Sequence, residues 1–178
     1  GLNLANVVVN PITNRLYTSN RLNPSLSVID CSSHTLLTNI FLLFGGSVNK
    51  VVVNPVTNRI YVMRGAVVEV VDGYSNTRIS SIFSANQGSF INMAVNPKTD
   101  LLYFLTNASP YVVAVVDGRS GALVATIPVS PLPAKIEVNP DNNRVYVVHN
   151  LGGLITSIDG TTNTVLETNV YGLGPVDV

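Results

Sequence analysis

The stretch Val51-Val52-Val53-Asn54-Pro55-Val56-Thr57-Asn58-Arg59-Ile60-Tyr61-Val62 decides the fold, because its pattern returns along the chain at a nearly fixed interval. In each copy a Val precedes Asn-Pro and a Tyr follows six residues after the Pro, and successive copies are separated by 44, 42 and 43 residues. The Asn-Pro pairs of the four copies begin at Asn10, Asn54, Asn96 and Asn139, and the tyrosines are Tyr17, Tyr61, Tyr103 and Tyr146. A period of this length indicates a repeat architecture.

A second marker keeps the same period: an Asp closes an apolar run in every repeat, at Asp30, Asp72, Asp117 and Asp159. Each Asp begins a tight turn, where its carboxylate can accept hydrogen bonds from backbone N–H groups two residues on. We therefore expect these residues to be turn formers, which we favour over the alternative of metal ligands. The repeated tyrosines lie in the middle of predicted strands, and we expect them to pack between repeats instead of forming a binding cage.

Each repeat contains four short runs of β-branched and aromatic residues, separated by Gly, Pro, Asn and Asp. In the second repeat the runs are 51–53, 59–62, 67–71 and 77–83. This pattern predicts a four-stranded antiparallel meander, which must stack against copies of itself to cover two apolar faces. The predicted fold is all-β, a β-propeller of four blades at approximately 1–46, 47–88, 89–132 and 133–171, with 172–178 starting a fifth first strand. We expect the segment to belong to a longer array or an oligomeric assembly.

The residues Val51 to Val62 closely resemble the YVTN family of β-propeller repeats, and the match extends over essentially the whole chain. Asp100-Leu101 departs from the pattern, since the other repeats have Asn-Arg there. The resemblance implies a protein similar to the surface-layer and secreted proteins that carry such repeats, usually without a known reaction. We therefore expect a non-catalytic extracellular or cell-surface module for structural assembly, in a surface layer or filament, or for protein or glycan interaction.

Composition excludes several other classes of protein. Ten Lys and Arg residues balance ten Asp and Glu residues, and the basic side chains are scattered singly, so the footprint of a nucleic-acid binder is missing. No apolar run is long enough to span a membrane. The single cysteine, Cys31, excludes an internal disulfide and a cysteine-based zinc site. Abundant Asn, Ser and Thr suggest a neutral surface, which favours an extracellular location.

No catalytic, metal or cofactor site can be assembled from the sequence. His34 and His149 are more than a hundred residues apart, and neither has Cys, Asp or Glu at ligand spacing. There is no Gly-x-Ser-x-Gly elbow and no Gly-rich phosphate loop before a helix. The alternative is a fragment of a propeller enzyme or of a small-molecule-binding propeller, with its site in the central channel.

The best candidate for such a binding site is a column of polar residues in the first strand of every repeat. Polar side chains stand four residues before each Asn-Pro, and Asp177 holds the same position in the start of the fifth repeat, while Glu137 adds a charge in the fourth: Asn6, Lys50, Asn92, Lys135 and Asp177, with Glu137. The innermost strand of a blade lines the central channel of a propeller, where pockets commonly open. The column is either a binding mouth or the polar lining of a wet channel.

Two further features concern partners. The outermost predicted strand of the first repeat reads Ile40-Phe41-Leu42-Leu43-Phe44 where the third has Ile127-Pro128-Val129-Ser130-Pro131. An unbroken apolar edge indicates a partner interface, with packing under a loop as the alternative, and we expect self-association. Asn107-Ala108-Ser109 is a glycosylation sequon, weakened by Pro110.

Overall fold

The computed structural model describes residues 4–20, 24–43, 48–83, 88–106 and 109–172, and all the regular structure in these ranges is β-strand. The strands are β1 Leu4–Asn10, β2 Arg15–Asn20, β3 Ser25–Asp30, β4 Thr35–Phe41, β5 Lys50–Asn54, β6 Arg59–Arg64, β7 Val67–Asp72, β8 Thr77–Phe83, β9 Phe90–Asn96, β10 Leu101–Thr106, β11 Val112–Asp117, β12 Leu123–Pro128, β13 Pro133–Asn139, β14 Arg144–His149, β15 Leu154–Asp159 and β16 Thr164–Val170. The all-β prediction is confirmed. Nowhere in the described ranges is there a helix long and apolar enough to cross a membrane.

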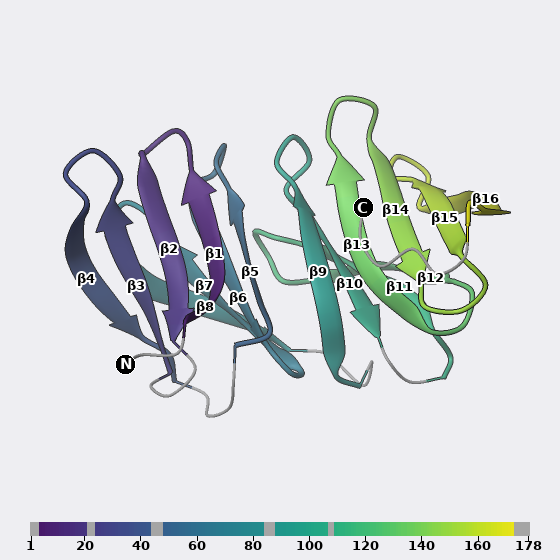
Figure 1. The fold of residues 1–178 in the computed structure, drawn as a ribbon, viewed down its shortest axis with the longest axis horizontal. Coiled ribbons are helices and arrows are strands. Elements are labelled where there is room, and N and C mark those ends of the chain that lie inside the picture. The colour runs from purple at the N-terminus through teal and green to yellow at the C-terminus, as the bar shows by residue number, and fades with distance from the viewer. Residues whose placement is uncertain (1–3, 21–23, 44–47, 84–87, 107–108, 173–178) are drawn as a thin grey trace. The chain divides into compact units, whose positions relative to one another are not determined.

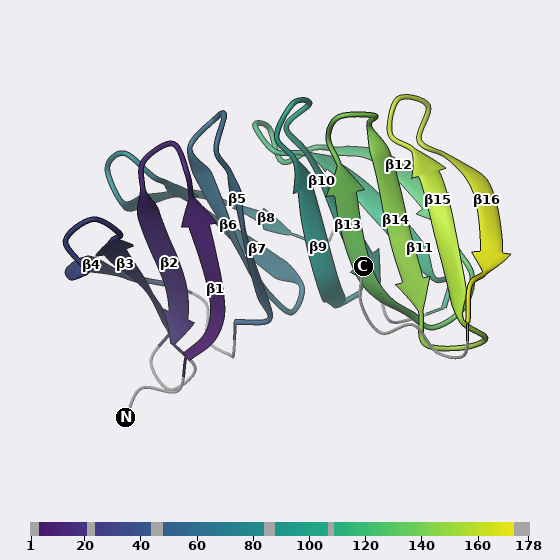
Figure 2. The ribbon, with the colours of Figure 1, turned by 45° about the horizontal axis from the view of Figure 1, so that its top comes forward.

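The strands form four sheets of four, and each sheet is an antiparallel meander in chain order. We call these sheets blades 1 to 4. Blades 1 and 2 make up one compact unit, residues 1–83, and blades 3 and 4 make up a second, residues 84–178. Within each unit the first strands of the two blades lie side by side, β1 next to β5 and β9 next to β13 (Figure 1). Figure 2 shows the four strands of blade 4 in order from β13 to β16.

The Asn of each Asn-Pro pair builds the turn between the first and second strands. Asn10 Oδ1 accepts from the backbone N–H of Ile12 at 3.0 Å, and Asn54 Oδ1 accepts from Val56 at the same distance. Each turn ends in a residue with positive φ, between 52° and 56°, at Asn14, Asn58, Asp100 and Asn143. Asn and Asp are the non-glycine residues that tolerate this left-handed region best. Asp100 therefore departs from the repeat in chemistry but keeps the backbone conformation.

The repeated aspartates close the turn between the third and fourth strands, as the sequence predicts. Asp72 Oδ1 accepts from the backbone N–H of Tyr74 at 3.0 Å, and from the N–H and hydroxyl of Ser75 at 2.8 and 2.9 Å. These hydrogen bonds, the one from the Ser75 backbone foremost, lower the pKa of Asp72. The other three aspartates make the same pair of backbone contacts to the residues two and three positions on: Asp30 to Ser32 and Ser33, Asp117 to Arg119 and Ser120, and Asp159 to Thr161 and Thr162.

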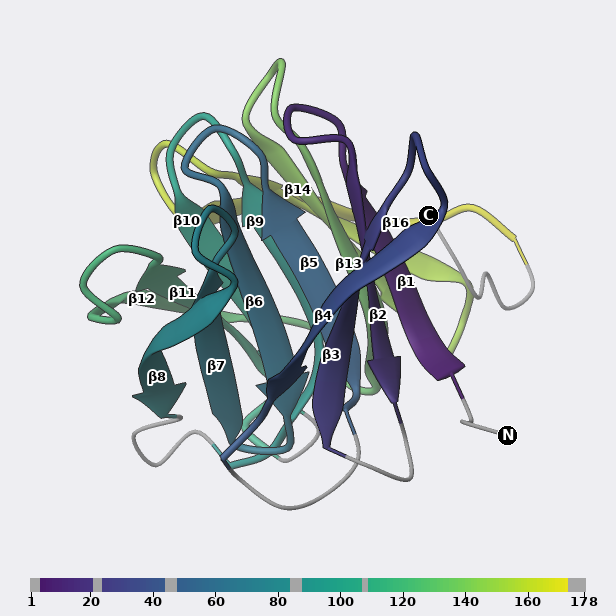
Figure 3. The ribbon, with the colours of Figure 1, turned by 90° about the vertical axis from the view of Figure 1, so that its left-hand side faces the viewer.

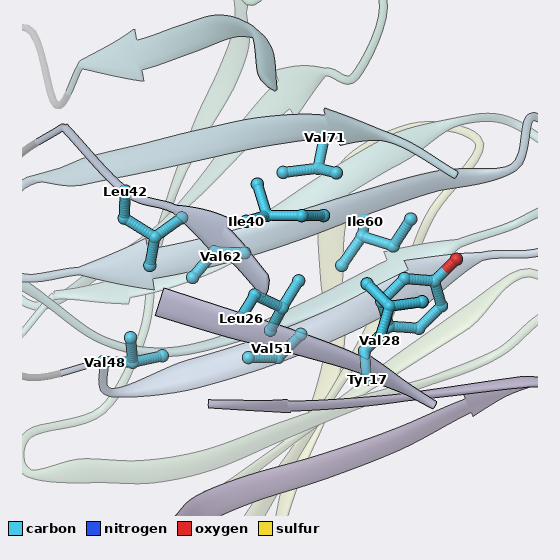
Figure 4. Close-up of a cluster of buried hydrophobic side chains, with 10 residues drawn as sticks. All are labelled: Tyr17, Leu26, Val28, Ile40, Leu42, Val48, Val51, Ile60, Val62 and Val71. Atoms are coloured by element: carbon cyan, nitrogen blue, oxygen red, sulfur yellow. The ribbon is translucent and has the colours of Figure 1, made fainter. Parts of the chain in front are cut away.

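Successive side chains along a strand point to opposite sides of the sheet, so every blade has two faces. We call the face that carries the repeat tyrosine the tyrosine face, and the other the opposite face. In the first unit the tyrosine face of blade 1 packs on the opposite face of blade 2, which brings Tyr17, Val28 and Ile40 against Ile60 and Val62 (Figure 4). The sheet of blade 1 is twisted, as strands normally are, so that β4 runs at a clear angle to β1 (Figure 3).

The second unit repeats this packing. Tyr103 and Val115 on the tyrosine face of blade 3 join Ile136, Val147 and Ile158 on the opposite face of blade 4 in one buried cluster. Tyr17 and Tyr103 are both fully buried, which confirms the packing role predicted for them. Burial raises the pKa of Tyr103 to about 12, so this phenol stays protonated and neutral.

A hydrogen bond between asparagines joins the two blades of each unit. Asn10 Nδ2 donates to Asn58 Oδ1 at 2.7 Å, and Asn96 Nδ2 donates to Asn143 Oδ1 at the same distance. The Asn of one Asn-Pro turn thus contacts the positive-φ residue of the next blade's turn. The site is tight, because a Cβ added to Gly73 would lie 2.3 Å from Asn58 Oδ1. We call this contact the asparagine link.

The Asp turn gives a prediction about stability. Asp72→Ala removes the acceptor of two backbone N–H groups and should lower the free energy of unfolding by about 0.5–2 kcal/mol, as the loss of other side-chain caps does. Asp72→Asn is the matched control, because its Oδ1 can still accept, and it should retain most of the stability. Urea unfolding at pH 7 measures both variants. Equal midpoints for Asp72→Ala and the parent would contradict the capping role.

Candidate functional site

Two members of the polar column predicted in the first strands, Asn6 and Asn92, are engaged in contacts between neighbouring blades. Asn6 Nδ2 donates to the carbonyl of Asn49, which directly precedes Lys50, at 3.3 Å. Asn92 is buried and its Nδ2 donates to the carbonyl of Ala134, which directly precedes Lys135, at 3.4 Å. The two asparagines therefore tie each first strand to the start of the next blade's first strand. The structure brings Asn6 close to Lys50, and Asn92 close to Lys135, within their respective units.

Among the described members of the column Glu137 alone is exposed, and it lies on the tyrosine face of blade 4. Lys135 lies on the same face and is half-buried, and both residues take part in further interactions. Asp177 lies outside the described residues. Asn6 and Asn92 thus act as structural donors, and Lys135 and Glu137 are the members of the column whose side chains remain reachable at the surface of unit 2.

In the apolar stretch at the end of the first repeat, the described side chains alternate between the core and the surface. Ile40 and Leu42 belong to the core between blades 1 and 2 and cannot serve as contact residues for a partner. Phe41 and Leu43 are 68% and 66% exposed. Phe44 and the sequon residue Asn107 lie outside the described part of the chain. The predicted edge is therefore reduced to two exposed side chains, Phe41 and Leu43.

A feature that the sequence analysis missed is a row of polar side chains on the opposite face of the blades. Its members stand three residues after the repeat Tyr and three before the repeat Asp: Asn20 and Ser27 in blade 1, Arg64 and Glu69 in blade 2, His149 and Thr156 in blade 4. Blade 3 has Thr106 and Ala114 at these positions. The signal was present in the sequence, since these are polar residues at fixed offsets in otherwise apolar strands. We call this set the polar row.

In blade 2 the polar row is a buried ion pair. Glu69 Oε1 lies 3.3 Å from Arg64 Nη1, and the two side chains are 0% and 1% exposed. Glu69 Oε2 accepts from the backbone N–H of Leu43 at 3.1 Å and lies 3.8 Å from Arg78 Nε. Leu43 follows the last strand of blade 1, so the carboxylate binds the segment that connects the two blades. Burial lowers the pKa of Arg64, and the adjacent Glu69 opposes that effect.

In blade 4 the polar row is an uncharged chain of hydrogen-bonded side chains. His149 Nδ1 lies 3.2 Å from the carbonyl of Pro131, which can only accept, so Nδ1 carries the proton. His149 Nε2 then accepts from Thr156 Oγ1 at 2.9 Å, and Thr168 Oγ1 lies 2.9 Å from Thr156 Oγ1. Pro131 follows the last strand of blade 3. His149 therefore also holds the segment between two blades, and burial lowers the pKa of its imidazole.

In blade 1 the row consists of amide and hydroxyl groups. Asn20 Nδ2 donates to Ser25 Oγ at 2.9 Å and to Ser27 Oγ at 3.1 Å, and Ser27 Oγ donates to Asn39 Oδ1 at 2.6 Å. Asn20 is 2% exposed, and within the described ranges its Oδ1 has no hydrogen-bond partner. The row in blade 1 thus retains a buried acceptor.

The polar rows have the burial and the hydrogen bonds of structural elements, and they do not form a recognisable reactive centre. Among the described residues no three His, Cys, Asp or Glu side chains are grouped as metal ligands. The four Asp carboxylates are used by turn N–H groups, and Cys31 is half-buried beside such a turn. What these side chains can do chemically is fix backbone segments between blades.

Comparison with known proteins supports the architecture. No family model matches the sequence, and no curated protein sequence matches it. Among solved structures the chain is similar to hydrazine synthase of Kuenenia stuttgartiensis, with a TM-score of 0.80 and 19% identity over 93% of this chain and 48% of that one. The fold of that protein is β-propeller-like, and the prediction of a β-propeller built from four-stranded antiparallel blades is confirmed. The chain spans about half the length of the solved structure it matches.

The ion pair of blade 2 predicts a large effect of removing one partner. Glu69→Leu leaves the Arg64 cation buried beside Arg78, and should lower the free energy of unfolding by about 3–5 kcal/mol. The double variant Arg64→Met, Glu69→Leu removes the charge together with its partner and should recover most of this loss. Urea unfolding of parent, single and double variants tests the pair. A single variant as stable as the parent would contradict the role of Glu69.

His149 predicts a pH dependence of stability. Its pKa in the folded chain lies below the value of about 6.5 expected when unfolded, so below that pH the unfolded state binds more protons. This contribution is complete above about pH 6.5 and declines as the pH falls towards the lower pKa of the folded state. Unfolding midpoints between pH 7.5 and pH 5 should fall for the parent. They should fall less for His149→Asn, because this variant lacks the buried imidazole; equal slopes for the parent and the variant would refute the assignment.

Proposed function

We propose that this chain is a non-catalytic β-propeller module of an extracellular or cell-surface protein, which contributes to structural assembly by contact with its own copies or with other proteins or glycans. The resemblance of residues 51–62 to the YVTN repeats supports this proposal, together with the near absence of net charge. On this view the chain acts as a scaffold, and its polar groups serve the stacking of blades.

The observation that carries the proposal is the apolar outer strand of blade 1. β4 lies at the edge of its sheet, where it pairs with β3 alone. Leu37 and Phe41 on this strand and Leu43 shortly after it are exposed, and Phe41 and Leu43 are each more than 60% exposed. The corresponding strand of blade 3 ends in Pro128, which blocks strand pairing. An apolar edge without such protection favours lateral contact with another chain.

The alternative function is an enzyme fragment or a small-molecule binder. The name of the structural neighbour is that of an enzyme, but 19% identity supports the shared fold alone. The polar column that suggested a channel site contributes two asparagines to contacts between blades. We therefore retain the assembly module as the proposed function.

Sedimentation tests the lateral contact. The parent at micromolar concentration should self-associate, because pairing along β4 removes Phe41 and Leu43 from water. The variant Phe41→Lys, Leu43→Lys should shift the assembly towards monomer, because two cations would have to be brought to the contact. The matched control is Ile12→Lys, Val56→Lys, since these apolar side chains are as exposed but lie on turns. A monomeric parent contradicts self-association, and a fall in association in the control alone contradicts the role of β4.

A further inference from the structure

The opposite face of blade 1 is open to solvent along β1, although the same first-strand positions in blades 2 and 4 are buried or half-buried. Val7 and Val9 on this face are 67% and 48% exposed, and Leu36 is exposed on β4, at the other edge of the same sheet. We propose that this face is a docking surface for a further blade of the same repeat class, which presents its tyrosine face to blade 1. The inference concerns a different surface from the lateral contact of β4 and does not depend on it.

The first argument is the chemistry that both covered faces share with blade 1. Val7 corresponds by repeat position to Val51 in blade 2 and Ile136 in blade 4, which are buried against the tyrosine face of the preceding blade in their units. Leu16 corresponds in the same way to Ile60 and Val145, and Ile29 to Val71 and Ile158. Blade 1 has therefore kept the apolar side chains that receive a preceding blade. A solvent-facing sheet would be expected to carry polar side chains there.

The second argument is the polar row. In blade 2 the row accepts the Leu43 N–H from the segment that follows blade 1, and in blade 4 it binds the Pro131 carbonyl from the segment that follows blade 3. In blade 1 the buried Asn20 Oδ1 has no partner within the described ranges. A buried acceptor without a partner is costly. A backbone N–H from the segment that follows a docked blade would satisfy it, as Leu43 satisfies Glu69.

The third argument is the asparagine link. Asn143, which accepts from Asn96, is oriented by its own Nδ2, which donates to Thr161 Oγ1 at 3.1 Å. Asn14 in blade 1 has the same positive φ and the same orienting bond, from its Nδ2 to Ser32 Oγ at 2.7 Å. Its Oδ1 is thereby placed to accept from the Asn-Pro turn of a preceding blade. Apolar side chains, the polar row and the link thus agree on one kind of occupant.

The occupant is not the far end of a second copy of this chain. The tyrosine face of blade 4 carries Glu137, Ser157, Glu167 and Asn169 where blade 1 has Val8, Val28, Thr38 and Ile40. Docking this face on Val7 and Val9 would take two carboxylates out of water against apolar side chains, at a high cost in free energy. The partner must instead present an apolar tyrosine face, of the kind that blades 1 and 3 use within their units.

The test adds such a blade to the full chain. Residues 6–49 are duplicated in tandem between Ala5 and Asn6, so that the added blade precedes blade 1 in the phase of the repeat. The urea midpoint of unfolding should shift upward, and hydrogen exchange at the amides of β2 should slow. In the control, a copy of residues 8–49 follows Val178. It adjoins the tyrosine face of blade 4, which carries Glu137 and Glu167, and the urea midpoint of unfolding should not rise. A midpoint that does not rise after the first addition overturns the proposal, whether the added blade stays unfolded or folds without docking.

A point variant identifies the contact. Val9→Glu should have little effect on the midpoint of the parent, where the side chain is half exposed. The same change in the original blade 1 of the lengthened chain should cancel most of the upward shift. An undiminished shift would overturn the proposed face. A parent that sediments as a dimer, and becomes monomeric with Val7→Glu, would show that a second copy occupies the face and would likewise overturn the proposal.

Discussion

The asparagine of the Asn-Pro pair in blades 1 and 3 carries out two tasks, and the stacking of the two blades in each unit depends on both. Its carbonyl oxygen accepts the N–H that closes the turn, as Asn10 does with Ile12, and its amide nitrogen donates to the turn of the next blade, as Asn10 does with Asn58. The left-handed backbone of Asn58 places its oxygen at this point. Because one side chain fixes both a turn and a neighbour, the position of the turn sets the register of the interface.

The polar row solves a related problem at the other end of the strands. The chain must leave the outermost strand of one blade and cross to the innermost strand of the next, and the backbone groups of this crossing lose water near the interface. Glu69 accepts a hydrogen bond from the Leu43 N–H, and His149 donates one to the Pro131 carbonyl. Different side chains thus perform the same task in different blades. The row therefore varies in chemistry from blade to blade, while the two asparagine links described here are alike.

Sequence reasoning reached the fold because period, turn residues and strand runs all agree. It also placed Asp72 in a turn and Tyr17 in the core, since both roles follow from local position. It did not separate Ile40 from Phe41, although alternation along a strand sends one inward and the other outward. The ion pair between Arg64 and Glu69 lies across two strands, and the link from Asn10 to Asn58 lies across two blades. Neither pairing is encoded in a local pattern, so both required the structure.

The distances along the chain between linked residues have a kinetic consequence. The asparagine links join residues 48 and 47 positions apart, and the contact between Lys98 and Asp141 joins residues 43 apart. These contacts between blades therefore close loops of about one repeat, and the entropy of loop closure changes only slowly with loop length. Mean sequence separation of contacts, which governs the folding rate of small domains, would not grow as blades are added. An array of this design could fold progressively from one end during synthesis, each blade using its predecessor as a template.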